Sequence, residues 1–219
     1  MRGYDIFLNE INEVTSKYPK LKKVDKDGHS YLSGELDIVD ANGLHWDTYE
    51  VEIHCREGYP KRYPSLYEVG GKIPRIADWH IYEDTGSCCV NVLQEEIIRC
   101  KDGITLLQYI EEEVLPYLFN QTNRRVEGYY VNGEYSHGLI GEYEFYSRIL
   151  KTGSDIRKTV EWLLFVAGGK KLSRTDVCFC GSNRKYRKCH RDAYDKLSIL
   201  GEKYLKEDAS RIAKSAGLI

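Results

Sequence analysis

The chain has 219 residues, of which 42% are hydrophobic and 30% charged, and its formal net charge is -2. This length fits one domain of ordinary size plus a small appendage, and the balanced charge does not call for nucleic acid or a membrane surface as partner. No apolar run approaches the roughly 20 residues that span a bilayer, and the N-terminus lacks the apolar stretch of a secretory signal. We therefore expect a cytoplasmic protein whose seven cysteines are reduced.

The first 75 residues predict a helix followed by an antiparallel meander. Apolar residues at helical spacing indicate a helix over residues 4–18, which Pro19 closes. Alternation of apolar and polar residues predicts extended segments over residues 30–39, 48–54 and 66–73. A hairpin turn at 40–43 is predicted to join the first two. Together these segments predict a mixed α+β fold.

The rest of the chain predicts mainly helices. Helical spacing of apolar residues indicates helices over residues 104–118, 142–150, 155–167 and 192–214. Two stretches, 75–100 and 120–140, lack periodicity. An irregular stretch inside a compact domain is usually functional or disordered, and the richness of the first one in Trp, His and Cys favours function.

Four candidate metal ligands are concentrated near the C-terminus. Two cysteines one residue apart are followed, after an eight-residue spacer, by an adjacent Cys-His pair: Cys178, Cys180, Cys189 and His190. The span is too short for a core of its own, so this spacing predicts a closed, structural Zn²⁺ site. Three thiolates and a neutral imidazole would leave the site with a charge near -1, which the four basic residues of the spacer would offset.

The most reactive-looking segment is residues 79–93, Trp-His-Ile-Tyr-Glu-Asp-Thr-Gly-Ser-Cys-Cys-Val-Asn-Val-Leu. A nucleophilic cysteine needs exposure, an environment that favours the thiolate and polar groups that stabilise an oxyanion, and a loop of this composition could supply them. The alternative is core packing, because cysteine beside apolar residues is often simply buried.

Residues 1–150 resemble the ubiquitin-conjugating enzymes. The markers are Gly-Tyr-Pro-x-x-Tyr-Pro at 58–64, Gly-Gly-Lys-Ile-Pro at 70–74, His80, and Gly-Ser-Cys-Cys-Val-Asn-Val-Leu at 86–93. The resemblance implies a ubiquitin-conjugating-like catalytic domain with an antiparallel meander and flanking helices. It places Cys89 at the catalytic position, where it would form a thioester with a protein C-terminus and pass it to an amine, and Cys88 at a neighbouring apolar position.

The chain departs from that family around its histidine. His80 matches the histidine of the family's His-Pro-Asn tripeptide, but the sequence here is His-Ile-Tyr, so Tyr82 could replace the missing Asn as a hydrogen-bond donor or the role could be unfilled. For His80 we favour a structural anchor of the loop over a direct acid–base role. His137 is a second candidate for the general base, with a surface turn as its alternative.

These departures and the Cys-His tail resemble the prokaryotic branch of the family, some members of which belong to type II CBASS-like antiphage systems. In that setting the implied partner is a cyclic-oligonucleotide synthase (a CD-NTase), whose C-terminus would be the donor. The chain has no Gly-rich phosphate loop for an adenylation domain of its own. The resemblance therefore implies a short type that depends on activation supplied elsewhere.

Residues 151–219 are predicted to form a helical module around the metal ligands. Residues 176–192 resemble the SEC-C zinc motif, which implies a docking element; a cap that only stabilises the C-terminal helix is the alternative. The only support for nucleic-acid binding is the basic spacer, and its four charges would neutralise only a few phosphates. The rival to an enzyme is a non-catalytic protein-binding module that keeps the fold and has lost the chemistry.

Overall fold

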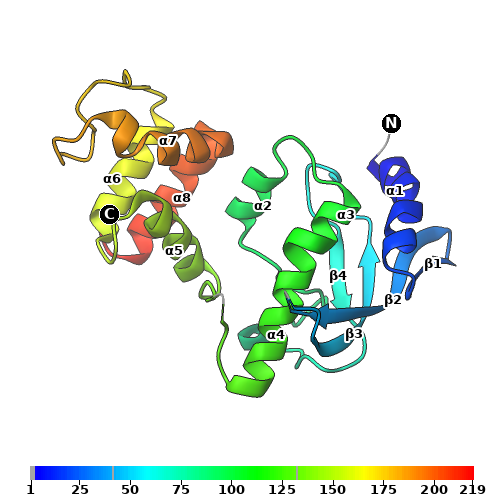
Figure 1. The fold of residues 1–219 in the computed structure, drawn as a ribbon. Coiled ribbons are helices and arrows are strands. Elements are labelled where there is room, and N and C mark those ends of the chain that lie inside the picture. The colour runs from blue at the N-terminus through cyan, green and yellow to red at the C-terminus, as the bar shows by residue number, and fades with distance from the viewer. Residues whose placement is uncertain (1–2, 41, 132) are drawn as a thin grey trace. The chain divides into compact units, whose positions relative to one another are not determined.

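A computed structural model describes residues 3–40, 42–131 and 133–219. The chain forms two compact units, one of residues 1–91 and 99–134 and the other of residues 92–98 and 135–219 (Figure 1). Residues 135–150 lie in the second unit, whereas the sequence-based prediction assigns them to the ubiquitin-conjugating-like domain; the functional division remains a prediction. Part of the predicted hairpin turn at 40–43, residue 41, lies outside the described residues.

The first unit is built on a four-stranded antiparallel sheet whose strands follow one another in chain order (Figure 1). The strands are β1 (Leu21–Lys26), β2 (His29–Val39), β3 (His45–His54) and β4 (Ser65–Glu68). Leu32 lies opposite Ile53 and Leu36 opposite Tyr49, and all four side chains are buried. Because side chains alternate along a strand, this register gives the sheet one apolar face.

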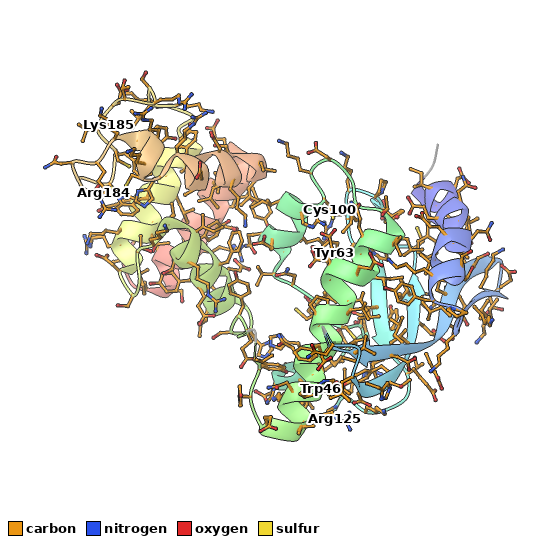
Figure 2. The ribbon with its side chains drawn as sticks, viewed as in Figure 1. Trp46, Tyr63, Cys100, Arg125, Arg184 and Lys185 are labelled. Carbon is orange, nitrogen blue, oxygen red and sulfur yellow. The ribbon has the colours of Figure 1, made fainter. Side chains whose placement is uncertain are left out.

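Helices cover that apolar face. They are α1 (Gly3–Lys17), α3 (Leu106–Tyr109), a π-helical turn (Ile110–Val114) and α4 (Leu115–Glu127). Their buried residues include Phe7, Ile11, Val14, Leu106, Tyr109, Ile110, Val114 and Leu118. Tyr63 and Cys100 join the same core (Figure 2). Arg125 of α4 pairs with Asp47 of β3, with Nη1 and Oδ2 2.5 Å apart, which ties this helix to the sheet.

The helical segment from α3 to the end of α4 begins where the sequence predicts and ends later than predicted. Thr105 caps α3 in a reciprocal capping box with Gln108, which fits the predicted start. Its C-terminal end differs from the prediction, because the helix runs to Glu127 and not to residue 118. Gln121, Thr122 and Asn123 are polar yet buried. Apolar periodicity therefore stops before the helix does.

Other differences from the sequence-based expectation have similar causes. Strand β1 was not predicted, because Leu21 is its one fully buried side chain and the exposed positions include three lysines. The extended segment expected over 66–73 is shorter, since β4 ends at Glu68. The sequence Val-Asn-Val-Leu at 90–93 predicts a short extended segment, and this prediction is wrong, because residues 90–92 form no strand and helix α2 begins at Leu93.

The second unit is helical. Its elements are α2 (Leu93–Arg99, of which residues 93–98 belong to this unit), α5 (Leu139–Leu150), α6 (Ile156–Ala167), α7 (Arg191–Leu197) and α8 (Glu202–Ser215). The sequence predicts Ser154 or Asp155 as the cap of α6, and Asp155 is the cap, because its side chain accepts a hydrogen bond from the backbone N–H of Lys158. No helix among the described residues has the length and apolar character needed to span a membrane.

A buried carboxylate joins three helices of this unit. Asp208 of α8 is 2% exposed, and its Oδ2 lies 2.9 Å from Nε2 of Gln94 in α2 and 2.5 Å from the hydroxyl of Tyr146 in α5. Arg211 adds an ion pair to the other carboxylate oxygen. Helix α2, which begins four residues after Cys89, is thus held by polar contacts in the core of the second unit.

Candidate functional site: a reactive loop and a metal centre

The loop that carries the cysteines is a small hairpin attached to the edge of the sheet. Ile81 and Cys88 form a bridge pair, and the backbone N–H of Cys89 donates to the carbonyl of His80 over 2.7 Å. The N–H of Cys88 donates to the carbonyl of Leu66 in β4 over 2.8 Å. These bonds hold both cysteines on backbone that is paired on two sides.

Helix α4 holds the other end of this hairpin with side chains spaced along one face. The hydroxyl of Tyr117 donates to the carbonyl of His80 over 3.1 Å, and Nε2 of Gln121 donates to the carbonyl of Trp79 over 3.1 Å. Arg124 bonds Asp78 and lies over the Trp79 ring, 4.3 Å from its centroid. Positions separated by three and four residues share a helix face, so α4 presents all three contacts to one segment.

The two cysteines have different surroundings. Cys88 is 8% exposed and belongs to the apolar core, whereas Cys89 is part-exposed, which confirms the expected order of burial. Burial raises the pKa of the Cys88 thiol to about 12, so it stays protonated near neutral pH. Since the thiolate is the nucleophile, Cys88 is unsuited to covalent chemistry. Of the pair, Cys89 is the thiol that reagents can reach.

His80 is held on several sides. Its Nε2 lies 2.8 Å from Oε2 of Glu134, and its ring packs edge-on against Tyr130 with centroids 5.5 Å apart. The side chain is 13% exposed, and the residue adopts the left-handed conformation, with φ +54°. A ring held by a hydrogen bond to a carboxylate and by an aromatic neighbour fits a structural anchor, the role favoured from the sequence. Glu134 gave no sequence signal as its partner.

The two remaining candidate residues, Tyr82 and His137, belong to different units. The side chain of Tyr82 is 52% exposed, and its backbone N–H donates to the carbonyl of Ser87 across the hairpin. His137 is exposed in a bend before α5 and belongs to the second unit. Cys89, His80 and Tyr82 therefore lie in one hairpin of the first unit, and His137 is not part of it. Their catalytic roles remain predictions.

The four candidate metal ligands come together in the second unit. Their ligand atoms all lie within 4.8 Å of one another. Sγ of Cys180 lies 3.5 Å from Sγ of Cys189, and Nδ1 of His190 lies 3.4 Å from Sγ of Cys178 and 3.2 Å from Sγ of Cys189. Tetrahedral Zn²⁺ with bond lengths of about 2.3 Å to sulfur and about 2.0 Å to nitrogen places its ligand atoms about 3.5–3.8 Å apart. The donor set and spacing therefore fit a metal ion.

Backbone turns create this arrangement. The N–H of Gly181, in the left-handed conformation, donates to the carbonyl of Cys178, and the N–H of Cys178 donates to the carbonyl of Arg184. The other two ligands follow a short 3₁₀ turn, Tyr186–Lys188, just before α7. Tyr186 of this turn is fully buried, and its ring packs against the ring of Phe179, with centroids 6.3 Å apart. The chain thus folds back after a tight turn and brings both ligand pairs together.

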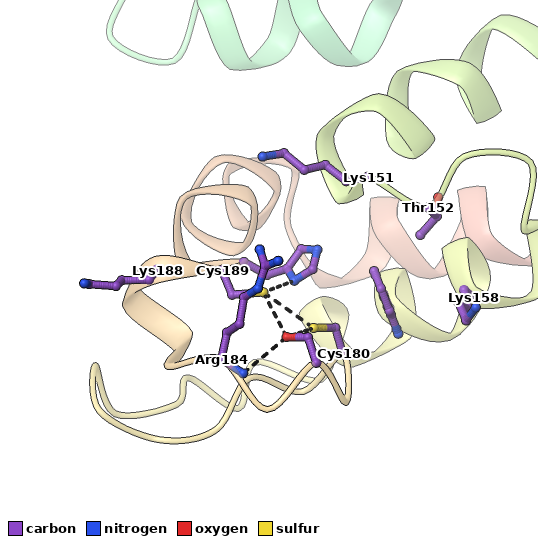
Figure 3. A pocket seen from close by; sticks show the side chains of 10 residues that line it. Lys151, Thr152, Lys158, Cys180, Arg184, Lys188 and Cys189 are labelled. Atoms are coloured by element: carbon purple, nitrogen blue, oxygen red, sulfur yellow. Dashed lines mark hydrogen bonds between the residues drawn. The ribbon is translucent and has the colours of Figure 1, made fainter.

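Groups behind the ligands orient them. Ser182 Oγ lies 3.1 Å from Sγ of Cys180 and 3.4 Å from Sγ of Cys189 (Figure 3). Burial raises the pKa of the Cys180 thiol, but hydrogen bonds from Ser182 and Cys189 outweigh it and lower that pKa to about 6. Ring nitrogen Nε2 of His190 lies 2.8 Å from the carbonyl oxygen of Leu150. Supporting groups of this kind are general in metal sites, but nothing in the sequence marks Leu150 for this role.

The fold and sites together define a mixed α+β protein with a cysteine-bearing hairpin in the first unit and a Cys₃His cluster that could bind a metal ion in the second. Residues 174–192 match the SEC-C motif, which covers all four ligands and the basic spacer between them. No curated protein and no solved structure matches the chain.

Proposed function

We propose that the chain is a ubiquitin-conjugating-like acyl transferase with Cys89 as its nucleophile. The observation that carries this proposal is the contrast between the two adjacent thiols: Cys88 is buried with a raised pKa, and Cys89 is part-exposed on the same hairpin. A part-exposed thiol on a hairpin that hydrogen bonds anchor to β4 and α4 is suited to attack a carbonyl that a partner delivers.

The proposed reaction has two steps. The Cys89 thiolate attacks the activated C-terminal carbonyl of a donor protein, a carbon–sulfur bond forms, and the activating group departs. A lysine amine of the acceptor then attacks the thioester, which forms an amide, releases the thiolate and gives up a proton. A thioester is activated relative to an amide, so the second step needs no ATP. The first step therefore needs either a donor that has already been activated or an exchange of the acyl group with an existing linkage.

The order of elements supports the fold that the resemblance implies. A helix, a four-stranded antiparallel meander, a cysteine-bearing hairpin and a long helix follow one another in the first unit. In this proposal His80 acts as a positioning residue, because its ring is engaged by Glu134 and its carbonyl accepts the Cys89 N–H. Tyr82 and His137 are the proposed hydrogen-bond donor and general base.

The Cys₃His cluster is proposed to hold one structural Zn²⁺. All four positions of a tetrahedral ion are filled by side chains, so no open position remains for a substrate. Its function would be to fold the second unit and present a docking surface. The donor that we propose for such docking is the C-terminus of a cyclic-oligonucleotide synthase in a bacterial antiphage system, as the family resemblance implies.

One observation favours the rival function, a protein-binding module without catalysis. The described part of the reactive hairpin has an exposed tyrosine at the position where the family carries its oxyanion-stabilising Asn. A binding module would retain the hairpin for its shape and would not need the thiol.

Trapping of the acyl intermediate separates the two functions. Cys89→Ser replaces the thiol by a hydroxyl, whose ester is slower to react than a thioester, so the variant should retain a covalently bound donor when it is purified from its native host under denaturing conditions. Cys88→Ser is the matched control and should trap none. A partner that binds both variants equally, and only non-covalently, would favour the binding module.

A further inference from the structure

A pocket of about 390 Å³ lies in the second unit, and three of the four candidate metal ligands, Cys180, Cys189 and His190, line part of it (Figure 3). This volume is at the small end of the range for ligand pockets, which is about 300–1,000 Å³. Its walls come from three segments: the end of α5 with Lys151, the helix α6 with Lys158 and Trp162, and the spacer between the ligand pairs with Arg184 and Lys188.

The pocket carries positive charge that the protein leaves largely unneutralised. Lys158 pairs with Asp155, with Nζ and Oδ2 2.8 Å apart. For Lys151, Arg184 and Lys188, the described residues supply no ion pair, and all three side chains are exposed. Zn²⁺ with three thiolates and a neutral imidazole would contribute -1, so the three cations exceed it by two charges.

The charge of the whole unit has the same sign. Residues 92–98 and 135–219 contain 17 Lys and Arg against 12 Asp and Glu, a formal charge of +5, whereas the first unit contains 15 against 22, a formal charge of -7. The near-neutral total of the chain therefore conceals a basic unit. A positive field around a small pocket raises the local concentration of anions.

We propose that this pocket binds the phosphate monoester group of a small phosphorylated molecule. A phosphate monoester carries about -1.5 to -2 charges near pH 7, which would balance the excess of two. The Arg184 guanidinium can donate two parallel hydrogen bonds to phosphate oxygens, and Lys151 and Lys188 supply compact charges. Trp162 provides an apolar wall for the rest of the molecule.

A monoester fits this pocket better than a nucleic-acid backbone does. Each internal phosphate of an RNA carries a single charge, and RNA binding draws its strength from a surface that neutralises several successive phosphates. The described pocket instead gathers three cations without an ion pair around one small volume, which the candidate metal ligands also line. The proposal is independent of the acyl transfer assigned to Cys89.

Calorimetry on the full-length, zinc-loaded chain at constant ionic strength tests the proposal. Inorganic phosphate and adenosine monophosphate should each bind saturably, one per chain, and adenosine should not bind. Arg184→Gln combined with Lys188→Gln should weaken adenosine monophosphate binding at least tenfold, because each charge-assisted hydrogen bond contributes strongly. Lys185→Gln combined with Arg187→Gln is the matched control, since it removes the same charge from the same exposed spacer outside the pocket.

A third variant tests the pocket without a change inside the metal-binding motif. Lys151→Gln lies outside the motif, so it should keep one zinc per chain and still weaken adenosine monophosphate binding severalfold. Equal loss of affinity in the two spacer variants would overturn the proposal in favour of diffuse charge attraction. Absence of saturable phosphate binding would overturn it outright. Binding of a single-stranded RNA oligomer without binding of the monophosphate would assign the surface to nucleic acid.

Discussion

The Nε2 atom of His190 lies 2.8 Å from the carbonyl oxygen of Leu150, forty residues earlier in the chain. A ring N–H donates to that carbonyl, which leaves Nδ1 with its lone pair for a metal ion. The same bond links the metal cluster to the end of α5, and α5 shares the Asp208 network with α2. The metal site is thereby connected to the core of its unit.

Metal removal should therefore loosen more than the motif. Purified protein should contain about one zinc per chain, and chelation should unfold the region around residues 174–192 because metal-binding energy is folding energy there. Hydrogen exchange should also show reduced protection of α2, which packs in the same unit. Helix α1 of the first unit is the internal control and should keep its protection. Protein that holds no zinc and is fully protected throughout would contradict the assignment.

The buried carboxylate at the centre of the second unit should be indispensable to its stability. Asp208→Ala leaves the buried partners of the carboxylate, Gln94 and Tyr146, without their acceptor, and it removes one of the two ion pairs of Arg211, which keeps the pair with Glu142. Loss of one partner of a buried charged network costs about 3–5 kcal/mol. Urea denaturation should measure a loss of this size.

The matched control for Asp208 lies on the same helix. Glu202→Gln removes the exposed ion pair of Glu202 with Lys206 and should leave the free energy of unfolding nearly unchanged, because solvent screens such a pair. A comparable loss from both variants would mean that the buried network has no special role.

The close approach of two segments in the sheet should make Gly34 intolerant of any side chain. A Cβ at this position would lie 2.2 Å from the carbonyl oxygen of Lys20, and the residue has φ +144°. Gly34→Ala should force backbone movement and destabilise the first unit by more than Gly28→Ala, whose φ is +78° but whose Cβ would meet nothing within 4 Å. Thermal unfolding of both variants measures the difference, and equal melting temperatures would refute the steric explanation.

The reactivity of the two adjacent thiols should differ with pH. The raised pKa of Cys88, about 12, means that its thiolate forms only in strongly alkaline solution, so folded protein should resist iodoacetamide at Cys88 from pH 7 to pH 9. Cys89 should be modified first, as peptide mass spectrometry can determine. In denaturant both thiols should react at similar rates. Preferential modification of Cys88 in the folded protein would reverse the assignment.

Several features of the fold were predictable because local sequence specifies them. Alternation in β2 and β3, helical spacing in α1 and the capping residues Thr105 and Asp155 each reflect physics that acts within a few residues. Strand β1 could not be predicted in this way, because its lysine-rich pattern resembles a loop. Neither could the last turns of α4, whose buried residues are polar.

The candidate sites also combine features that the sequence predicted with contacts that it did not. The candidate metal ligands lie close together in the sequence, so their spacing alone predicted the cluster that the structure contains. The contacts that orient the ligands and the hairpin are distant in sequence: Leu150 behind His190, Tyr117 and Gln121 behind the hairpin, and Glu134 beside His80. They depend on tertiary packing, for which a single sequence gives no direct signal.

The identity of the adduct on Cys89 tests the proposed acyl transfer most directly. The chain is co-expressed with the product of its neighbouring gene, and intact mass is measured after denaturation with and without thiol reductant. The account predicts a mass increase that corresponds to a partner's C-terminus, that thiol removes, that persists in Cys88→Ala and that is absent from Cys89→Ala. An adduct that survives in Cys89→Ala, or a partner that binds tightly and forms no covalent product with the wild-type chain, would contradict it.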